Sequence, residues 1–111
     1  MNLSSSIVGN GVIVIDCQME NLDASNVRSF RDAIQPLMKD QTRVVVNMSQ
    51  MKFVDSSGLG ALISCLREVN GRKGDLKLCS MTRSVRALFE LMRMHRVFAI
   101  FETQEEAVAS F

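Results

Sequence analysis

The chain passes from an apolar run into a helix within ten residues, Met51-Lys52-Phe53-Val54-Asp55-Ser56-Ser57-Gly58-Leu59-Gly60. Ser56 or Ser57 is expected at the helix N-cap, where a hydroxyl accepts a hydrogen bond from an early backbone N–H. Gly58 and Gly60 leave the first turn thinly covered by side chains, so a partner is able to approach the backbone closely. A strand that enters a helix in this way is typical of an α/β fold.

Strand and helix patterns alternate on both sides of this stretch. Two strands, at residues 3–8 and 12–17, flank Gly9-Asn10-Gly11, whose residues favour the positive φ angles of a hairpin turn. Further strands are predicted at residues 43–48, 75–79 and 97–101, and helices are predicted after Asp23, Ser56, Thr82 and Thr103. The order β-β-α-β-α-β-α-β-α predicts one α/β domain over residues 1–111, with a mixed sheet and about four helices.

The composition and the motifs argue against a catalytic or metal-binding role for the chain. The 111 residues are 47% hydrophobic and include 13 basic and 12 acidic residues, a balance that disfavours non-specific nucleic-acid binding. The single histidine and the three cysteines form no pattern of zinc ligands or of paired disulfides. The GxSxG, GxGxxG and P-loop motifs are all incomplete. We therefore expect no metal, no cofactor and no enzymatic activity.

The start of the chain and its apolar runs bear on location. The first residues have neither the basic region nor the long apolar stretch of a secretory signal. The aliphatic runs are far shorter than the roughly 20 residues of a membrane span. Unpaired cysteines suit a reducing interior. We predict a cytoplasmic protein without membrane insertion.

Charge is unevenly distributed along the chain. Residues 67–96 have a net charge of +5, whereas residues 97–111 have a net charge of −3. The basic segment is interpreted either as solvated helix surface or as a face that meets an acidic partner or a phosphate. Phe89 is its one aromatic residue, so a base-stacking surface is not indicated.

Residues 55–60 match a known phosphorylation motif, D-S-S/T-G-L-G, and the match continues along the chain. Leu22-Asp23, the β-branched run at residues 43–48, the helix pattern at 84–91 and the strand pattern at 97–101 follow in the family's order. The sequence thereby resembles the STAS-domain anti-sigma factor antagonists. This resemblance implies a STAS-type fold for the single domain.

The resemblance also implies a partner switch. In this family the unphosphorylated protein binds an anti-sigma factor serine kinase and thereby frees a sigma factor. The family's phosphorylated serine directly follows the aspartate, so Ser56 is the implied phosphoacceptor and Ser57 is a secondary candidate. A serine phosphatase would reverse the modification. ATP and its metal would belong to the kinase, and the chain itself would be the substrate.

The implied partner-binding surface takes the motif residues together with one upstream aspartate. Asp23 corresponds to a family aspartate implicated in engaging the kinase, although a plain helix N-cap explains the same residue. The implied partner-binding set is Asp23, Asp55, Ser57, Gly58, Leu59 and Gly60.

Two positions depart from the family pattern. Glu20 stands where the family often has glycine, and Arg93 stands where the third helix commonly ends at glycine. A non-glycine at position 93 is expected to lengthen that helix or to remodel the loop. His95, in the same loop, is either a surface residue or part of a partner contact.

The sequence leaves other functions open. One is a STAS scaffold or accessory subunit of a signalling or lipid transport complex, in which the serine only caps a helix. Another is a small module that binds a nucleotide or phosphate at the glycine-thinned helix start. Formation of a homodimer is also left open.

Overall fold

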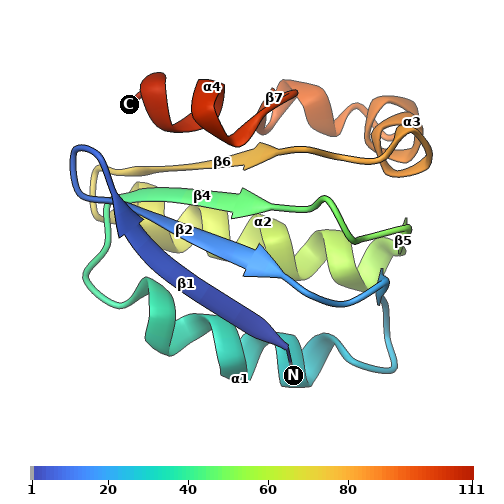
Figure 1. The fold of residues 1–111 in the computed structure, drawn as a ribbon. Coiled ribbons are helices and arrows are strands. Elements are labelled where there is room, and N and C mark those ends of the chain that lie inside the picture. Colours follow the sequence, from blue (N-terminus) through green and yellow to red (C-terminus); the bar gives the residue numbers. More distant parts are fainter. Residues whose placement is uncertain (1) are drawn as a thin grey trace.

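The computed structural model describes residues 2–111, which form an α/β fold around a five-stranded mixed sheet (Figure 1). The strand order is β1-β2-β4-β6-β7. The strands are β1 (Leu3–Val8), β2 (Val12–Cys17), β4 (Arg43–Asn47), β6 (Asp75–Cys79) and β7 (Ala99–Phe101). The predicted fold class and order of the main elements are confirmed. The last strand is shorter than predicted, since Val97 and Phe98 precede it.

The opening hairpin forms as the sequence predicts. Gly9 and Gly11 have φ angles of 48° and 75°, in the region that glycine occupies without steric cost. β1 pairs with β2 in antiparallel register, from Val8 opposite Val12 to Leu3 opposite Cys17. The remaining pairs, β2 with β4, β4 with β6 and β6 with β7, are parallel. The carboxyl ends of these parallel strands therefore share one edge of the sheet.

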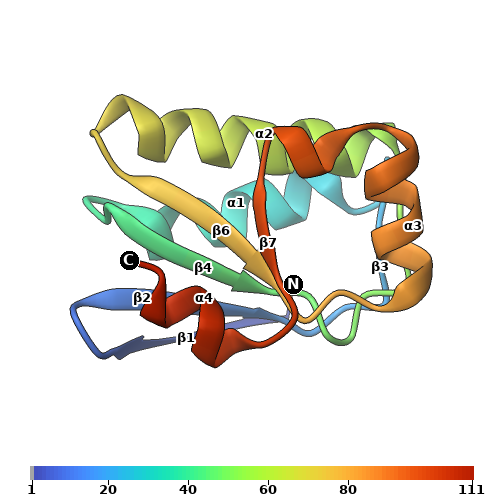
Figure 2. The ribbon, with the colours of Figure 1, turned by 90° about the horizontal axis from the view of Figure 1, so that it is seen from above.

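Helices cover both faces of the sheet (Figure 2). They are α1 (Val27–Met38), α2 (Ser56–Gly71), α3 (Arg83–Leu91) and α4 (Gln104–Ala109), with a short 3₁₀ turn, η1 (Met94–Arg96). α1 and α2 lie on one face, and α4 lies on the other. The predicted caps at Thr82 and Thr103 are present, and Thr103 and Glu106 form the predicted capping box. No helix of residues 2–111 has the length and apolar character to span a bilayer.

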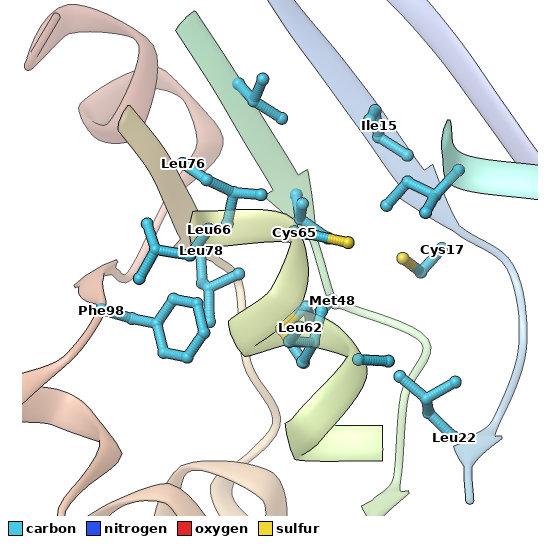
Figure 3. Close-up of a cluster of buried hydrophobic side chains, with 14 of the residues drawn as sticks. Ile15, Cys17, Leu22, Met48, Leu62, Cys65, Leu66, Leu76, Leu78 and Phe98 are labelled. Atoms are coloured by element: carbon cyan, nitrogen blue, oxygen red, sulfur yellow. The ribbon is translucent and has the colours of Figure 1, made fainter. Parts of the chain in front are cut away.

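The side chains of β2 divide the core into two parts. Ile13, Ile15 and Cys17 belong to the larger cluster, which packs against α1, α2 and α3. Figure 3 shows Ile15, Cys17, Leu62 and Cys65 within this cluster. The alternate residues Val12 and Val14 belong to a smaller cluster under α4. β2 is therefore buried on both faces, which explains the apolar run from Val12 to Ile15.

All three cysteines are buried and unpaired with one another. Burial is the main cause that raises the pKa of Cys17 to about 12 and of Cys65 to about 11. Burial also raises the pKa of Cys79. Because a thiolate is the reactive form, these thiols stay protonated and unreactive at neutral pH.

A second, two-stranded sheet was not predicted, although the strand-like run that leads into α2 was. β3 (Asn21–Leu22) and β5 (Phe53–Val54) pair in parallel, with Asn21 opposite Phe53 and Leu22 opposite Val54. Two residues are too few to show a strand periodicity. This pairing places the segment that leads into α1 beside the segment that leads into α2.

Arg93 remodels the loop after α3 and does not lengthen the helix. α3 ends at Leu91, and Arg93 has φ 59° and ψ 27°, in the left-handed region. The turn η1 follows directly. The arginine therefore adopts the conformation that the family's glycine would adopt without steric strain.

We expect Arg93→Gly to raise the free energy of unfolding by about 0.5–1 kcal/mol, because left-handed strain of about 1–2 kcal/mol exceeds the entropic cost of glycine. Urea denaturation measures the change. Arg93→Ala is the matched control, since it removes the same long side chain but keeps the Cβ atom. Equal stability of the two variants would contradict this account of Arg93.

Candidate functional site

Asp55 caps the start of α2 in place of the predicted serine. Its Oδ1 atom accepts a hydrogen bond of 2.9 Å from the backbone N–H of Gly58. Ser56 and Ser57 are the first two residues of the helix, so the prediction of a serine N-cap is wrong by one or two positions. Aspartate and serine are similarly good caps, and the backbone of Asp55 is the one with extended geometry, at φ −95° and ψ −174°.

Asp55 also connects α2 to the loop before α1. Its Oδ2 atom accepts a hydrogen bond of 3.2 Å from the backbone N–H of Ala24. Its own backbone N–H donates to the carbonyl oxygen of Leu22 at 3.1 Å. One carboxylate therefore holds the first turn of α2 against residues 22–24, although the two segments are about 30 positions apart in the sequence.

The two serines differ in their exposure. Ser56 is exposed at the first position of α2, whereas Ser57 is half-buried. Leu59 is buried, and its side chain belongs to the core. Ser56 is therefore the motif hydroxyl that is most accessible to an enzyme.

The two glycines of the first turns lie in different surroundings. A Cβ atom added at Gly58 would lie 2.4 Å from the carbonyl oxygen of Leu22 and 2.9 Å from Cγ1 of Val54. At Gly60 such an atom would have no neighbour within 4 Å. Gly58 thus allows α2 to pack closely on β3 and β5. Of the two glycines that were expected to leave the backbone accessible to a partner, only Gly60 has open space beside it.

The sequence suggested Asp23 as the N-cap of α1, but the structure shows a different cap. The N-cap is Asn26, and helix α1 begins at Val27. Asp23 lies in the preceding turn, where its Oδ1 accepts from the backbone N–H of Ser25 at 2.9 Å and its Oδ2 accepts from Asn21 Nδ2 at 2.7 Å. A turn lies between Asp23 and the start of α1, and the hydrogen bond from the backbone N–H of Val27 to the carbonyl oxygen of Asp23 closes this turn. The helix therefore begins at Val27 and not directly after Asp23.

Asp23 is partly exposed, and its carboxylate accepts several hydrogen bonds. The hydrogen bond donated by the Ser25 hydroxyl is the main cause that lowers the pKa of Asp23 below its ordinary value, followed by the bond from the Ser25 backbone. Through Ala24, which bonds to Asp55, this turn lies directly beside the start of α2. The structure therefore brings the turn of Asp23 together with the motif.

Phe53, Lys52 and Glu20 lie beside the motif and were not among the predicted site residues. The two residues of β5 face opposite ways: Val54 is buried, and Phe53 is 48% exposed. Lys52 Nζ forms an ion pair of 3.2 Å with Glu20 Oε1 on the surface. Exposure of Phe53 follows from strand alternation, but that signal needs the strand β5 to be known.

The site offers backbone donors and surface charge, but no group of metal ligands. In the part of the chain that the structure describes, residues 2–111, no three His, Cys, Asp or Glu side chains are placed to hold a metal ion. His95 is exposed in η1. The N-terminus of α2 carries the positive end of the helix dipole, which favours an anion.

Comparison with known proteins gives relatives over most of the chain. BtrV of Bordetella bronchiseptica is 27% identical over 100 residues, which cover 89% of this chain and 86% of BtrV. The anti-sigma-B factor antagonist of Staphylococcus aureus is 26% identical over 85 residues, which cover 76% of this chain and 79% of that protein.

Solved structures show the same fold. The anti-sigma factor antagonist SpoIIAA in its unphosphorylated form superposes with a TM-score of 0.76 and 25% identity, over 96% of this chain and 93% of SpoIIAA. Bacillus SpoIIAA in its phosphorylated form gives a TM-score of 0.70 and 23% identity, over 98% of both chains. The family model of the STAS domain matches residues 6–107. The chain therefore belongs to the STAS domain family, with anti-sigma factor antagonists among its homologues.

Proposed function

We propose that this chain is an anti-sigma factor antagonist whose binding to a partner is switched by phosphorylation of Ser56. The unphosphorylated form binds an anti-sigma factor serine kinase and frees a sigma factor, and a serine phosphatase restores this form. The observation that carries the proposal is the exposed Ser56 hydroxyl at the first position of a helix held in place by Asp55. The named functions of the Staphylococcus relative and of SpoIIAA support it.

The position of Ser56 suits a phosphoryl group. Phosphorylation adds a charge of about −1.5 to −2 and three acceptor oxygens. The N-terminus of α2 stabilises an anion by about 0.3–1 kcal/mol, so the modified domain does not need to rearrange. SpoIIAA, which has the same fold, has been solved in both its unphosphorylated and its phosphorylated form. The change of binding would then arise at the partner interface itself.

The other motif residues have distinct proposed parts. Asp55 and Gly58 shape the first turn, and Leu59 anchors it in the core. Asp23 presents a carboxylate to the kinase beside that turn, and the open space at Gly60 permits close approach. Ser57, half-buried next to Ser56, is the secondary phosphoacceptor. The proposed cycle uses ATP bound to the kinase and takes place in the cytoplasm.

Incubation with the cognate kinase and ATP is expected to add one phosphoryl group, and mass spectrometry of the peptides is expected to find it on Ser56. Ser56→Ala is expected to remain unmodified but still bind the kinase. Ser57→Ala is the matched control and is expected to be modified like the wild type. Phosphate found only at another residue would contradict the assignment of Ser56.

The same experiment separates the other functions left open by the sequence. A chain that stays unmodified but remains bound to its partner would favour a scaffold or accessory subunit. Calorimetric titration of the chain alone with ATP, ADP or inorganic phosphate tests the ligand-binding function. Heat of binding that Gly60→Val abolishes would favour that function over the switch.

Phe53→Ala is expected to weaken kinase binding by at least tenfold, because an exposed aromatic side chain beside the phosphoacceptor is a favourable interface anchor. Binding of the purified pair is measured by calorimetry. Ile7→Ala is the control, since Ile7 is 59% exposed but lies on the edge strand β1. Equal affinities for wild type and Phe53→Ala would exclude Phe53 from the contact.

A further inference from the structure

Strand β1 forms one edge of the five-stranded sheet, where its single neighbour is β2. Figure 1 shows no helix or strand of residues 2–111 beyond the outer side of β1. The opposite edge is formed by β7, which has three residues, whereas β1 has six. An open edge presents backbone N–H and C=O groups that are able to bond to another strand. β1 is therefore the longer of the two edges at which this sheet can be extended.

The hydrogen bonds of the hairpin show which residues of β1 face the open edge. The backbone N–H of Gln18 donates to the carbonyl oxygen of Asn2 at 2.9 Å, so Asn2 directs its backbone groups toward β2. Along an antiparallel strand this direction alternates from one residue to the next. The residues whose backbone groups point away from β2 are therefore Leu3, Ser5 and Ile7.

β1 lacks the features that commonly protect a sheet edge from pairing. Its sequence, Leu-Ser-Ser-Ser-Ile-Val, contains neither a charged residue nor a proline. Its register with β2 is continuous from Leu3 to Val8, so no bulge turns the strand away. Ile7 lies opposite Ile13 of the core and is nevertheless 59% exposed. A further strand beside β1 would cover the side chain of Ile7.

The three residues that face the open edge form a symmetric pattern. Ser5 lies at the centre, and Leu3 and Ile7 are apolar residues two positions away on either side. When two copies of β1 lie antiparallel about Ser5, serine is opposite serine and Leu3 is opposite Ile7. All three residues then use both their N–H and their C=O groups in bonds to the other copy. A shift by two residues would instead place Ser5 opposite an apolar residue.

We propose that two copies of this chain pair through β1, antiparallel about Ser5, and thereby join their sheets into one. Residues directly opposite each other have their side chains on the same face, so Ile7 of each copy contacts Leu3 of the other. Leu3 packs against the core, which gives Ile7 an apolar surface to contact. The uncharged edge offers no opposite charge to select a charged strand of another protein, whereas this pattern matches itself at every outward-facing position.

The proposed contact is isologous, because both copies use the same surface, and it therefore closes at a dimer. It consists of one strand from each copy, so we expect a weak dimer whose formation depends on concentration. Neither Ser56 nor Asp23 lies on β1. The dimer therefore does not rest on the proposed switch.

Sedimentation equilibrium of the full chain measures this dimer. The average mass is expected to rise from that of a monomer toward that of a dimer, and no further, as the concentration increases to about 1 mM. Ser56→Ala is expected to dimerise like the wild type. That result would separate the dimer from any test of the switch.

Opposite charges at Ser5 test the register, because this residue would face itself in the second copy. Ser5 is exposed, and Ser5→Lys or Ser5→Glu alone would place like charges opposite each other. Each variant is expected to dimerise about fivefold more weakly than the wild type at an ionic strength of about 0.01 M. An equal mixture is expected to form a mixed dimer at least as well as the wild type forms its own. Recovery in the mixture also shows that both variants are folded.

Ser49→Lys is the matched control for these variants. Ser49 is exposed in the turn after β4, so this variant adds the same charge away from β1 and is expected to dimerise like the wild type. Dimerisation of Ser5→Lys equal to that of Ser49→Lys would place the interface elsewhere.

Two further outcomes would overturn the proposal. A wild type that stays monomeric at about 1 mM would exclude the dimer and leave the edge to a strand of another protein. Failure of the mixture of Ser5→Lys and Ser5→Glu to recover a dimer would reject the register about Ser5.

Discussion

Replacement of Gly58 by alanine is expected to lower the free energy of unfolding by about 3 kcal/mol. The added Cβ atom would lie 2.4 Å from the carbonyl oxygen of Leu22, a backbone atom of β3. It would also lie 2.9 Å from the side chains of Leu22 and Val54. Because β3 is paired with β5, the strand cannot move away alone, and the first turn of α2 has to shift instead.

Gly60→Ala is the matched control, two residues further along the same helix. An alanine there meets no atom within 4 Å, so only the higher helix propensity of alanine acts. The free energy of unfolding is expected to rise by about 0.5–1 kcal/mol. Urea denaturation of both variants measures the difference. Gly58→Ala with the stability of Gly60→Ala would show that α2 does not need the close approach to Leu22.

The same contact links stability to the site. Leu22 directly precedes Asp23, and its carbonyl also accepts a hydrogen bond from the backbone N–H of Asp55. A shift of α2 away from Leu22 would therefore loosen the bond between Asp55 and Ala24 as well. Gly58 holds the turn of Asp23 and the helix of Ser56 in one arrangement, without itself presenting a side chain to a partner.

Most of the fold follows from local signals in the sequence. Gly9 and Gly11 determine the hairpin, and Thr82 and Thr103 cap the helices that follow them. These signals are reliable because each depends on residues a few positions apart. The parallel sheet then follows from the alternation of strands and helices.

The site was harder to predict, because its geometry depends on distant residues. Asp55, Ser56 and Ser57 are all good caps, and the pairing of β3 with β5 favours Asp55 by bringing Ala24 to its second carboxylate oxygen. The same long-range pairing exposes Phe53. The phosphoacceptor came from a resemblance to a family motif, and the roles of Ser56 and Asp23 stay predictions.

Ser56→Asp is expected to weaken kinase binding about a hundredfold, a loss of about 3 kcal/mol, while the fold is kept. The new carboxylate would lie at the N-terminus of α2, where the helix dipole stabilises a negative charge, so the domain is not expected to lose stability. In the complex the same charge would be desolvated against the partner and would lie beside the Asp55 carboxylate, so its cost arises only on binding.

Ser64→Asp is the matched control, because it tests whether a negative charge anywhere on α2 weakens kinase binding or only a charge at Ser56. Ser64 is exposed on the same helix, about 12 Å further along its axis, so it adds the same charge away from Asp55 and the first turn. Its kinase affinity is expected to stay within about threefold of the wild type, a difference of less than about 1 kcal/mol. Calorimetry with the purified kinase measures both variants. If Ser56→Asp bound as tightly as Ser64→Asp, charge at Ser56 would not control the partner, even if the kinase modifies that serine.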